Sequence, residues 1–260
     1  SAILQFETYL DSLRSIFSII ISVIDDTEQR LIHSSKQITY SYFKHCSMKF
    51  NFYLTYSTRP KYANRMYSIH IDVYNKLTFE YRGSLFIPIK FPFLPVYRIA
   101  NIIKIPQNNR LDMVKCSKDQ SCVHGQCMKY AENTANNRMF CHCHPGWTGK
   151  DCSIAYNCKC SPDSLCAGIE ATTGRSICIC PLNRWGLRCF LRNNICYENG
   201  SSVCLNNGQC VLTDDNLISE KKFFCLCQKG FSGDRCEIND AKIILSFDEN
   251  ILLTESILVH

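Results

Sequence analysis

Alternation of apolar and polar residues dominates the first part of the chain. In residues 48–56, one face of an extended segment carries Met48, Phe50, Phe52, Leu54 and Tyr56. In residues 66–74, one face carries Tyr67, Ile69, Ile71 and Val73, and the opposite face carries His70 and Asp72. A period of two indicates β-strands, and aromatic and β-branched residues suit a pleated, half-buried surface.

Similar patterns predict further strands at residues 15–24, 30–34, 37–43, 77–88 and 96–105. Turn-forming pairs follow two of the strands, at Asp25-Asp26 and Asn75-Lys76. About seven short strands with almost no helical periodicity predict a mainly β fold, and we expect a β-sandwich-like domain over residues 1–111.

Two apolar stretches of the sequence are candidates for a membrane anchor. The run at residues 16–24 is interrupted by Ser18 and Ser22 and is too short to span a bilayer. Charged residues interrupt residues 241–260, so this stretch predicts strands instead. We therefore expect residues 237–260 to begin a further β domain, and any membrane contact to come through regions absent from this chain.

Cysteines divide the chain of 260 residues into two chemically different parts. Of the 19 cysteines, all but Cys46 lie between residues 116 and 236, in three sets of six with a period of about 40 residues. In every set, the last two gaps are one and eight residues. The sets are Cys116, Cys122, Cys127, Cys141, Cys143, Cys152; Cys158, Cys160, Cys166, Cys178, Cys180, Cys189; and Cys196, Cys204, Cys210, Cys225, Cys227, Cys236.

This spacing resembles that of the epidermal growth factor-like (EGF-like) modules, a disulfide-dense scaffold of extracellular proteins. The first and third sets also share a Gly-aromatic-x-Gly motif before the last cysteine, with Trp147 and Phe231 as the aromatic residues. The resemblance predicts modules at residues 112–152, 153–189 and 190–236. The middle module is atypical, because one residue separates Cys158 from Cys160 and Asn183 replaces the first glycine of the motif. Asn tolerates the left-handed backbone conformation, so the turn can survive there.

The resemblance implies first-to-third, second-to-fourth and fifth-to-sixth pairing, since cysteine arithmetic alone leaves fifteen connectivities for each set. The implied disulfides are Cys116–Cys127, Cys122–Cys141, Cys143–Cys152, Cys158–Cys166, Cys160–Cys178, Cys180–Cys189, Cys196–Cys210, Cys204–Cys225 and Cys227–Cys236. Short linkers between the sets predict a semi-rigid rod. A module of this size needs such bridges, because it cannot bury enough apolar surface to offset its chain entropy.

No metal or cofactor is expected. The Cys141-His142-Cys143-His144 segment looks like a zinc ligand cluster in isolation, but the threefold six-cysteine period has no zinc explanation. Many EGF-like modules bind calcium two residues past the third cysteine, where this chain has Lys129, Gly168 and Leu212. These residues provide no side-chain oxygen for calcium.

Three single histidines, His33, His45 and His70, read as surface or strand-face residues, because no pair shares ligand spacing. Cys46 is the odd cysteine, which we interpret as a small buried hydrophobe; pairing outside this chain is the alternative. Asn199 begins the sequon Asn199-Gly-Ser and is expected to be glycosylated in a secretory context.

These features predict an extracellular, non-catalytic segment of a larger modular protein, either secreted or the ectodomain of a receptor, that serves recognition or adhesion through a protein partner. The net charge is +6, but the sequence contains no block of five like charges, so nucleic-acid binding is not expected. Two alternatives remain. The third module could act as a growth-factor-type ligand, or the N-terminal domain could bind or hydrolyse carbohydrate on an EGF-like stalk.

Overall fold

The described part of the chain is mainly β. The computed structural model describes residues 2–8, 15–27, 29–46, 48–54, 65–90, 98–106, 121–131, 138–198, 200–213 and 222–240. Within these ranges, α1 (Tyr42–His45) forms a single helical turn. No helix of the described residues is long and apolar enough to cross a bilayer.

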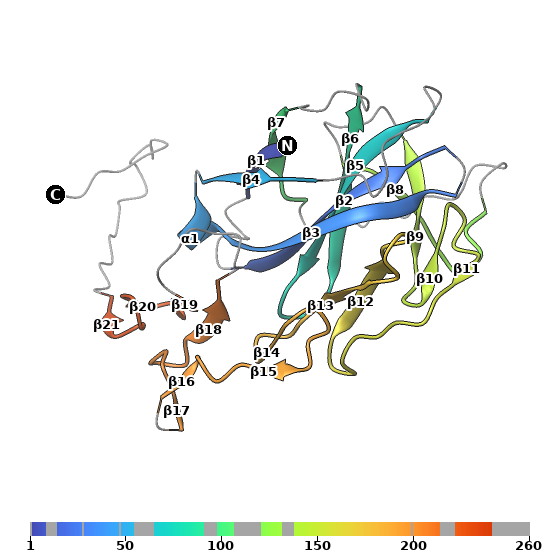
Figure 1. Cartoon of the computed structure of the whole chain (residues 1–260). Coiled ribbons are helices and arrows are strands. Elements are labelled where there is room, and N and C mark those ends of the chain that lie inside the picture. The colour runs from blue at the N-terminus through green and yellow to red at the C-terminus, as the bar shows by residue number, and fades with distance from the viewer. Residues whose placement is uncertain are drawn as a thin grey trace, which may run out of the picture.

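Two sheets form a sandwich in the N-terminal part (Figure 1). The four-stranded sheet is antiparallel throughout, in the order β3 (Leu31–Ser41), β2 (Ile16–Asp25), β5 (Tyr67–Asn75) and β6 (Tyr81–Ile89). The three-stranded sheet has the order β4 (Lys49–Phe52), β1 (Ala2–Glu7) and β7 (Ile99–Lys104). In the second sheet, β1 pairs antiparallel with β4 and parallel with β7.

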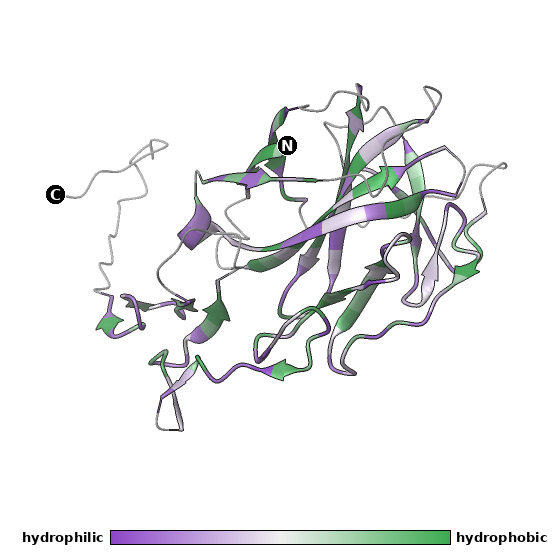
Figure 2. Ribbon diagram, viewed as in Figure 1, coloured by the Kyte–Doolittle hydropathy of each residue, from purple (hydrophilic) through white to green (hydrophobic). Residues whose placement is uncertain are grey.

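The main core lies between these two sheets and is built from the alternate residues of each strand. Figure 2 shows hydrophobic and polar positions alternating along the strands. The buried cluster consists of Ala2, Leu4, Phe6, Phe17, Ile19, Ile21, Ile38, Tyr40, Phe50, Phe52, Ile69, Ile71, Val73, Leu85, Ile87, Ile103 and Ile105. Period-two burial thus holds the sandwich together, as the sequence predicts.

Three disulfide-rich units follow, each with one longer hairpin and a shorter hairpin after it, and unit 3 begins with an additional short hairpin. Unit 1 comprises β8 (Gly125–Lys129), β9 (Met139–Cys143), β10 (Trp147–Thr148) and β11 (Ile154–Ala155). Unit 2 comprises β12 (Leu165–Ile169), β13 (Ser176–Ile179), β14 (Arg184–Trp185) and β15 (Leu191–Arg192). Unit 3 comprises β16 (Tyr197–Glu198), β17 (Ser201–Ser202), β18 (Gln209–Leu212), β19 (Phe223–Leu226), β20 (Phe231–Ser232) and β21 (Ile238–Asn239).

The short hairpin survives in unit 2 without the first glycine, though by another route than expected. Gly146 and Gly230 have φ of 90° and 95°, but Asn183 is not among the residues with positive φ. Its carbonyl still accepts a backbone hydrogen bond from Asn193 at 3.0 Å, as that of Gly146 does from Tyr156 at 2.8 Å. The turn therefore needs the carbonyl in place and not a left-handed residue.

All three units pack against the outer face of the four-stranded sheet, the face turned away from β1, β4 and β7 (Figure 1). Unit 1 places Met128, Tyr130 and Phe140 against Phe86. Unit 2 places Ile177 and Ile179 against Ile20 and Tyr74. Unit 3 places Val211 and Phe224 against Ile16. The semi-rigid rod expected from the short linkers is wrong, because each unit has its own apolar patch for the sheet.

This packing explains why β2 is apolar at most positions and not only at alternate ones. Ile16 to Ile24 of β2 are buried on both faces, since odd residues face the sandwich core and even residues face the units. Residues 30–34 and 37–43, predicted as two strands, form the single strand β3 up to Ser41 and then enter α1. The strand β1 was not predicted, and residues 241–260 lie outside the described residues.

Candidate binding cleft

Disulfides hold each unit together. Within the described residues, the structure joins the predicted pairs Cys122–Cys141, Cys143–Cys152, Cys158–Cys166, Cys160–Cys178, Cys180–Cys189, Cys196–Cys210, Cys204–Cys225 and Cys227–Cys236. Their Cα–Cα distances of 5.2 to 6.4 Å fall in the usual range for disulfides. Cys127 is also disulfide-bonded, and its predicted partner Cys116 lies outside the described residues.

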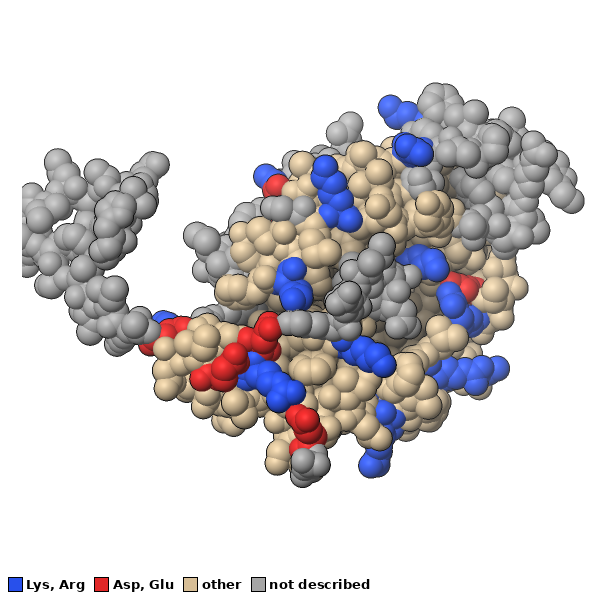
Figure 3. All heavy atoms as spheres, turned by 60° about the vertical axis from the view of Figure 1, so that its left-hand side comes forward, with Lys and Arg blue, Asp and Glu red and all other residues tan. Residues whose placement is uncertain are grey.

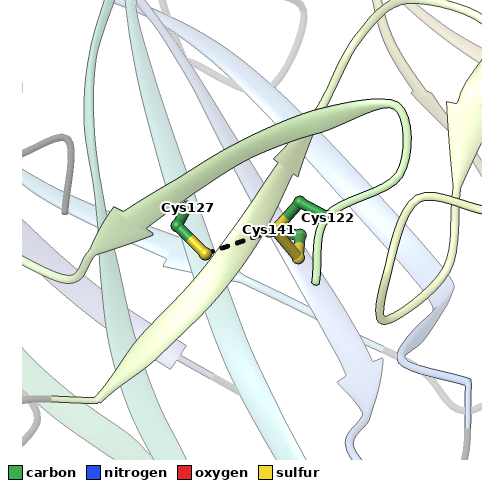
Figure 4. Close-up of side chains that lie close together, drawn as sticks. All are labelled: Cys122, Cys127 and Cys141. Carbon is green, nitrogen blue, oxygen red and sulfur yellow. Dashed lines mark hydrogen bonds between the residues drawn. A yellow bond between two sulfur atoms is a disulfide. The ribbon is translucent and has the colours of Figure 1, made fainter. Parts of the chain in front are cut away.

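Neighbouring sulfur atoms in these units come close without forming a metal site. Figure 4 shows Cys127 beside the Cys122–Cys141 disulfide, with the Sγ atoms of Cys122 and Cys127 3.4 Å apart. Cys141 and Cys143 are bonded to different partners, Cys122 and Cys152. A sulfur in a disulfide has no thiolate to offer a zinc ion, so the Cys-His-Cys-His segment is not brought together as a ligand set.

The remaining sequence candidates fall in different places. Cys46 is a thiol that follows α1 and is exposed, so its interpretation as a buried hydrophobe is wrong. His33 and His70 lie on strands, in β3 and β5, as expected, whereas His45 belongs to α1. His45 and His70 are buried, with 2% and 6% of their area exposed. Asn199 lies outside the described residues, and the neighbouring Gly200 and Ser201 are exposed.

A polar network fills the contact between the sheet and unit 1. His70 Nε2 lies 2.8 Å from Asp72 Oδ1, and its Nδ1 lies 3.0 Å from both Arg30 and the Tyr130 hydroxyl. Ser84 Oγ donates to Asp72 Oδ1 and lies 3.2 Å from His70 Nε2. Burial alone would raise the pKa of Asp72, but the electrostatic interaction and the hydrogen bond with His70 outweigh burial and lower the pKa to about 2.

This network contains Ser, His and Asp but not the geometry of a nucleophile relay. Arginine can only donate, so His70 Nδ1 accepts from Arg30 and the proton sits on Nε2, facing Asp72. In a catalytic triad the acid and the nucleophile bind opposite ring nitrogens. Here Ser84 and Asp72 share Nε2, and the His70 ring packs against Tyr130 and Phe140 of unit 1. The arrangement positions unit 1 on the sheet.

A buried carboxylate fastens unit 2 to the edge strand β3. Glu170 is 3% exposed and accepts hydrogen bonds from the Ser35 backbone N–H at 2.9 Å and the Ser35 hydroxyl at 2.8 Å. Arg175 adds an ion pair at 2.5 Å. Burial opposes ionisation, but the hydrogen bonds from Arg175 and Ser35 prevail and lower the pKa of Glu170. The backbone N–H of Ala171 also donates to the carbonyl of Ile32 at 2.9 Å.

Beside this contact, a cleft of about 410 Å³ opens between β3, unit 2 and unit 3. Among the described residues, its cationic lining consists of Lys36, Lys76, Arg175 and Arg184, and this described lining contains no Asp or Glu. Trp185 and Leu187 contribute apolar surface that is 46% and 71% exposed, together with Pro181, Leu182 and Leu212. The Trp185 indole donates to the Arg192 carbonyl at 3.2 Å.

Two of these cations have carboxylate partners that lie outside the described lining. Glu170 pairs with Arg175, and Asp163 pairs with Arg184 at 2.9 Å, so Lys36 and Lys76 leave the described lining with a positive balance. Figure 3 shows Lys and Arg side chains spread over one face of the molecule, with Asp and Glu gathered mostly toward its lower left.

Sequence reasoning did not find this cleft, because its residues come from segments more than 130 positions apart. Ser35 and Gln37 lie on β3, whereas Arg184 and Trp185 lie on β14. The predicted strands at residues 30–34 and 37–43 also left Ser35 and Lys36, which line the cleft, between them.

Comparison with known proteins places part of the chain in a family. Residues 196–235, which cover most of unit 3, match the model of the EGF-like domain. The chain contains an EGF-like domain. The chain is also similar to protein lin-12 of Caenorhabditis elegans, with 33% identity over 78 residues. The matched region is 29% of this chain and 5% of lin-12, so the chain corresponds to a small fraction of that relative.

Proposed function

We propose that this chain is a non-catalytic recognition segment of an extracellular protein, either secreted or the ectodomain of a receptor, and that it binds a protein partner. The observation that carries the proposal is the disulfide framework of units 1 to 3, since such bridges form and persist only in an oxidising compartment. The EGF-like domain and the similarity to lin-12 support it.

Units 1 and 2 are proposed to be EGF-like as well, with modules at residues 112–152, 153–189 and 190–236. Both units repeat the long and short hairpins of unit 3, and both place the last cysteine at φ of 60°, against 61° for Cys236. Cys152, Cys189 and Cys236 each donate a backbone hydrogen bond to the glycine three residues earlier. The same local structure thus recurs three times.

The recognition role is supported by how the modules are used. They do not hold the sandwich at a distance but build a composite surface with it, and this surface carries the basic cleft. The alternative of a hydrolytic N-terminal domain needs converging carboxylates in a pocket. The cleft lining within the described residues includes none.

The test is secretion of the chain from cultured cells behind a signal peptide, followed by non-reducing peptide mapping and a cell-binding assay. We expect the nine disulfides and saturable binding to cell surfaces that protease treatment of the cells abolishes. The same chain made in a reducing cytosol serves as the control. Native material with free thiols among the cysteines of residues 116–236, or protease-resistant binding, contradicts the proposal.

A further inference from the structure

The short hairpin of unit 2 exposes four large apolar side chains. Leu187, Phe190 and Leu191 are 71%, 57% and 52% exposed, and Trp185 is 46% exposed. Figure 1 shows β14 and β15, the two strands of this hairpin, at the lower edge of the molecule. We call these four residues the unit 2 tip. Exposed apolar surface that is flanked by polar residues marks sites of contact with proteins or membranes.

The fold of the hairpin does not require apolar residues at the tip. In every unit, the last cysteine donates a backbone hydrogen bond to the glycine three residues earlier, so equivalent positions can be matched. The residue after that glycine and the residue after that cysteine are exposed in all three units. They are polar in units 1 and 3 and apolar in unit 2: Lys150 and Ser153, Asp234 and Glu237, Leu187 and Phe190. Only unit 2 places apolar surface in water at both positions.

The hairpin has an apolar face and a cationic face. Trp185 and Leu191 are register partners in the β14–β15 ladder, and Arg184 and Arg192 form the other pair. Directly opposed side chains lie on the same face of a ladder, and successive side chains lie on opposite faces. The aromatic ring and the leucine therefore share one face, and the two guanidinium groups share the other.

Arginines surround the tip, and the chain around it contains no acid. Residues 181–197 contain three arginines and no Asp or Glu. Arg184 pairs with Asp163 of the same unit at 2.9 Å. Arg188 and Arg192 are exposed, and within the described ranges neither pairs with a carboxylate. Two cations beside the tip thus remain for an anionic partner.

Polar groups of the hairpin are paired within it. The Gly186 carbonyl accepts a hydrogen bond from the Cys189 N–H at 3.1 Å. The Trp185 indole N–H donates to the Arg192 carbonyl at 3.2 Å. Below the lipid headgroups there is no water to pair with such groups, so a segment that enters lipid must pair them internally. These groups stay paired when the tip enters lipid, whereas a protein partner could pair them itself.

We propose that the unit 2 tip inserts into the surface of a phospholipid bilayer that contains anionic lipid. The apolar side chains enter the boundary between headgroups and acyl chains, and Arg188 and Arg192 contact lipid phosphates. A second copy of this chain fits less well, because two tips would bring like charges together. The contact goes beyond the protein-binding role proposed above. It needs no spanning segment, and it departs from the expectation that only regions absent from this chain reach a membrane.

The test is sedimentation of the full disulfide-bonded chain with vesicles of phosphatidylcholine and phosphatidylserine in a two-to-one ratio. We expect saturable binding, and weaker binding to vesicles of phosphatidylcholine alone. Trp147→Phe leaves Trp185 as the single tryptophan and gives unit 1 the residue that unit 3 has in Phe231. On binding, the Trp185 emission should shift to the blue and be quenched by lipids that are brominated on their acyl chains.

Leu187→Lys separates insertion from charge attraction, because it removes apolar surface and adds a cation. Lysine is also the unit 1 residue at this position. We expect about tenfold weaker binding, the contribution of burying one large apolar side chain. Phe190→Ser should act similarly. Val123→Lys, on a 57% exposed residue of unit 1, adds the same charge and should leave binding unchanged. Arg188→Gln should weaken binding and reduce its dependence on salt.

Three results overturn the inference: no binding to the mixed vesicles, an unchanged Trp185 emission in the bound state, or equal or tighter binding of Leu187→Lys. Self-association that Leu187→Lys abolishes assigns the tip to a second copy and also overturns it. So does loss of cell binding by this variant without any vesicle binding, because the tip then contacts a protein.

Failure of this inference is distinguishable from failure of the proposed function. Anionic lipid lies mainly in the cytoplasmic leaflet of intact cells, so the cell-binding assay reports the protein partner and the vesicles report the tip. If the disulfides are intact and protease-sensitive cell binding persists while vesicles do not bind, the membrane contact is wrong and the recognition role stands.

Discussion

Substituting Ile179 should destabilise the whole described body, although this residue belongs to a small disulfide-bonded unit. Its side chain is 0% exposed because it packs with Ile20 and Tyr74 of the sheet. Ile179→Ala removes three buried carbons, worth about 0.8 kcal/mol each, and leaves a cavity. We expect a loss of about 3–4 kcal/mol in the free energy of unfolding, or about 10 °C in melting temperature.

The assay is denaturant unfolding of the non-reduced protein followed by far-UV circular dichroism. Leu187→Ala, in the same unit but 71% exposed, is the matched control and should change stability by less than about 0.5 kcal/mol. A double-mutant cycle with Ile20→Ala then isolates the contact between sheet and unit, with an expected coupling of about 1 kcal/mol or more. A coupling near zero would refute the packed arrangement, even if Ile179→Ala alone were destabilising.

Three further predictions concern acid, the polar network and the sequon. Burial and the Lys44 charge lower the pKa of His45 from 6.5 to about 4, so the stability that its neutral form contributes is present at neutral pH and is lost as the pH falls through 6.5 toward 4. The full effect is about 3 kcal/mol, and a urea midpoint that does not fall between pH 7 and 4 contradicts it. Arg30→Ala should cost about 2–3 kcal/mol, because it leaves Tyr130 and His70 without their cationic donor; unchanged denaturation would show that the network is dispensable. Secreted protein should lose mass on treatment with an N-glycosidase, and Asn199→Gln should abolish that shift.

The sandwich could be predicted from the local sequence, because the alternation of apolar and polar residues within each strand indicates which side chains are buried. The alternation at Phe50 and Phe52, and at Ile69, Ile71 and Val73, corresponds to side chains of the main core. Strand β1 has the same period, with Ala2, Leu4 and Phe6 buried. It was missed because this signal is short.

Long-range packing could not be predicted in the same way. An outward-facing Ile20, Tyr74 or Phe86 shows that something covers the sheet but does not identify it. The cysteine spacing predicted the units, but it did not indicate that their apolar residues pack against the sheet. In the sequence, Glu170 has the character of an ordinary polar loop residue. Only the fold places Ser35 beside it.

Small-angle X-ray scattering of the intact chain tests the central claim most directly, because a folded-back arrangement and a rod differ in size. With the three units packed on the outer face of the sheet, we expect a radius of gyration near 18 Å, the value for a compact chain of this length. A scattering profile with a globular head and an extended stalk, and a clearly larger radius, would contradict the account.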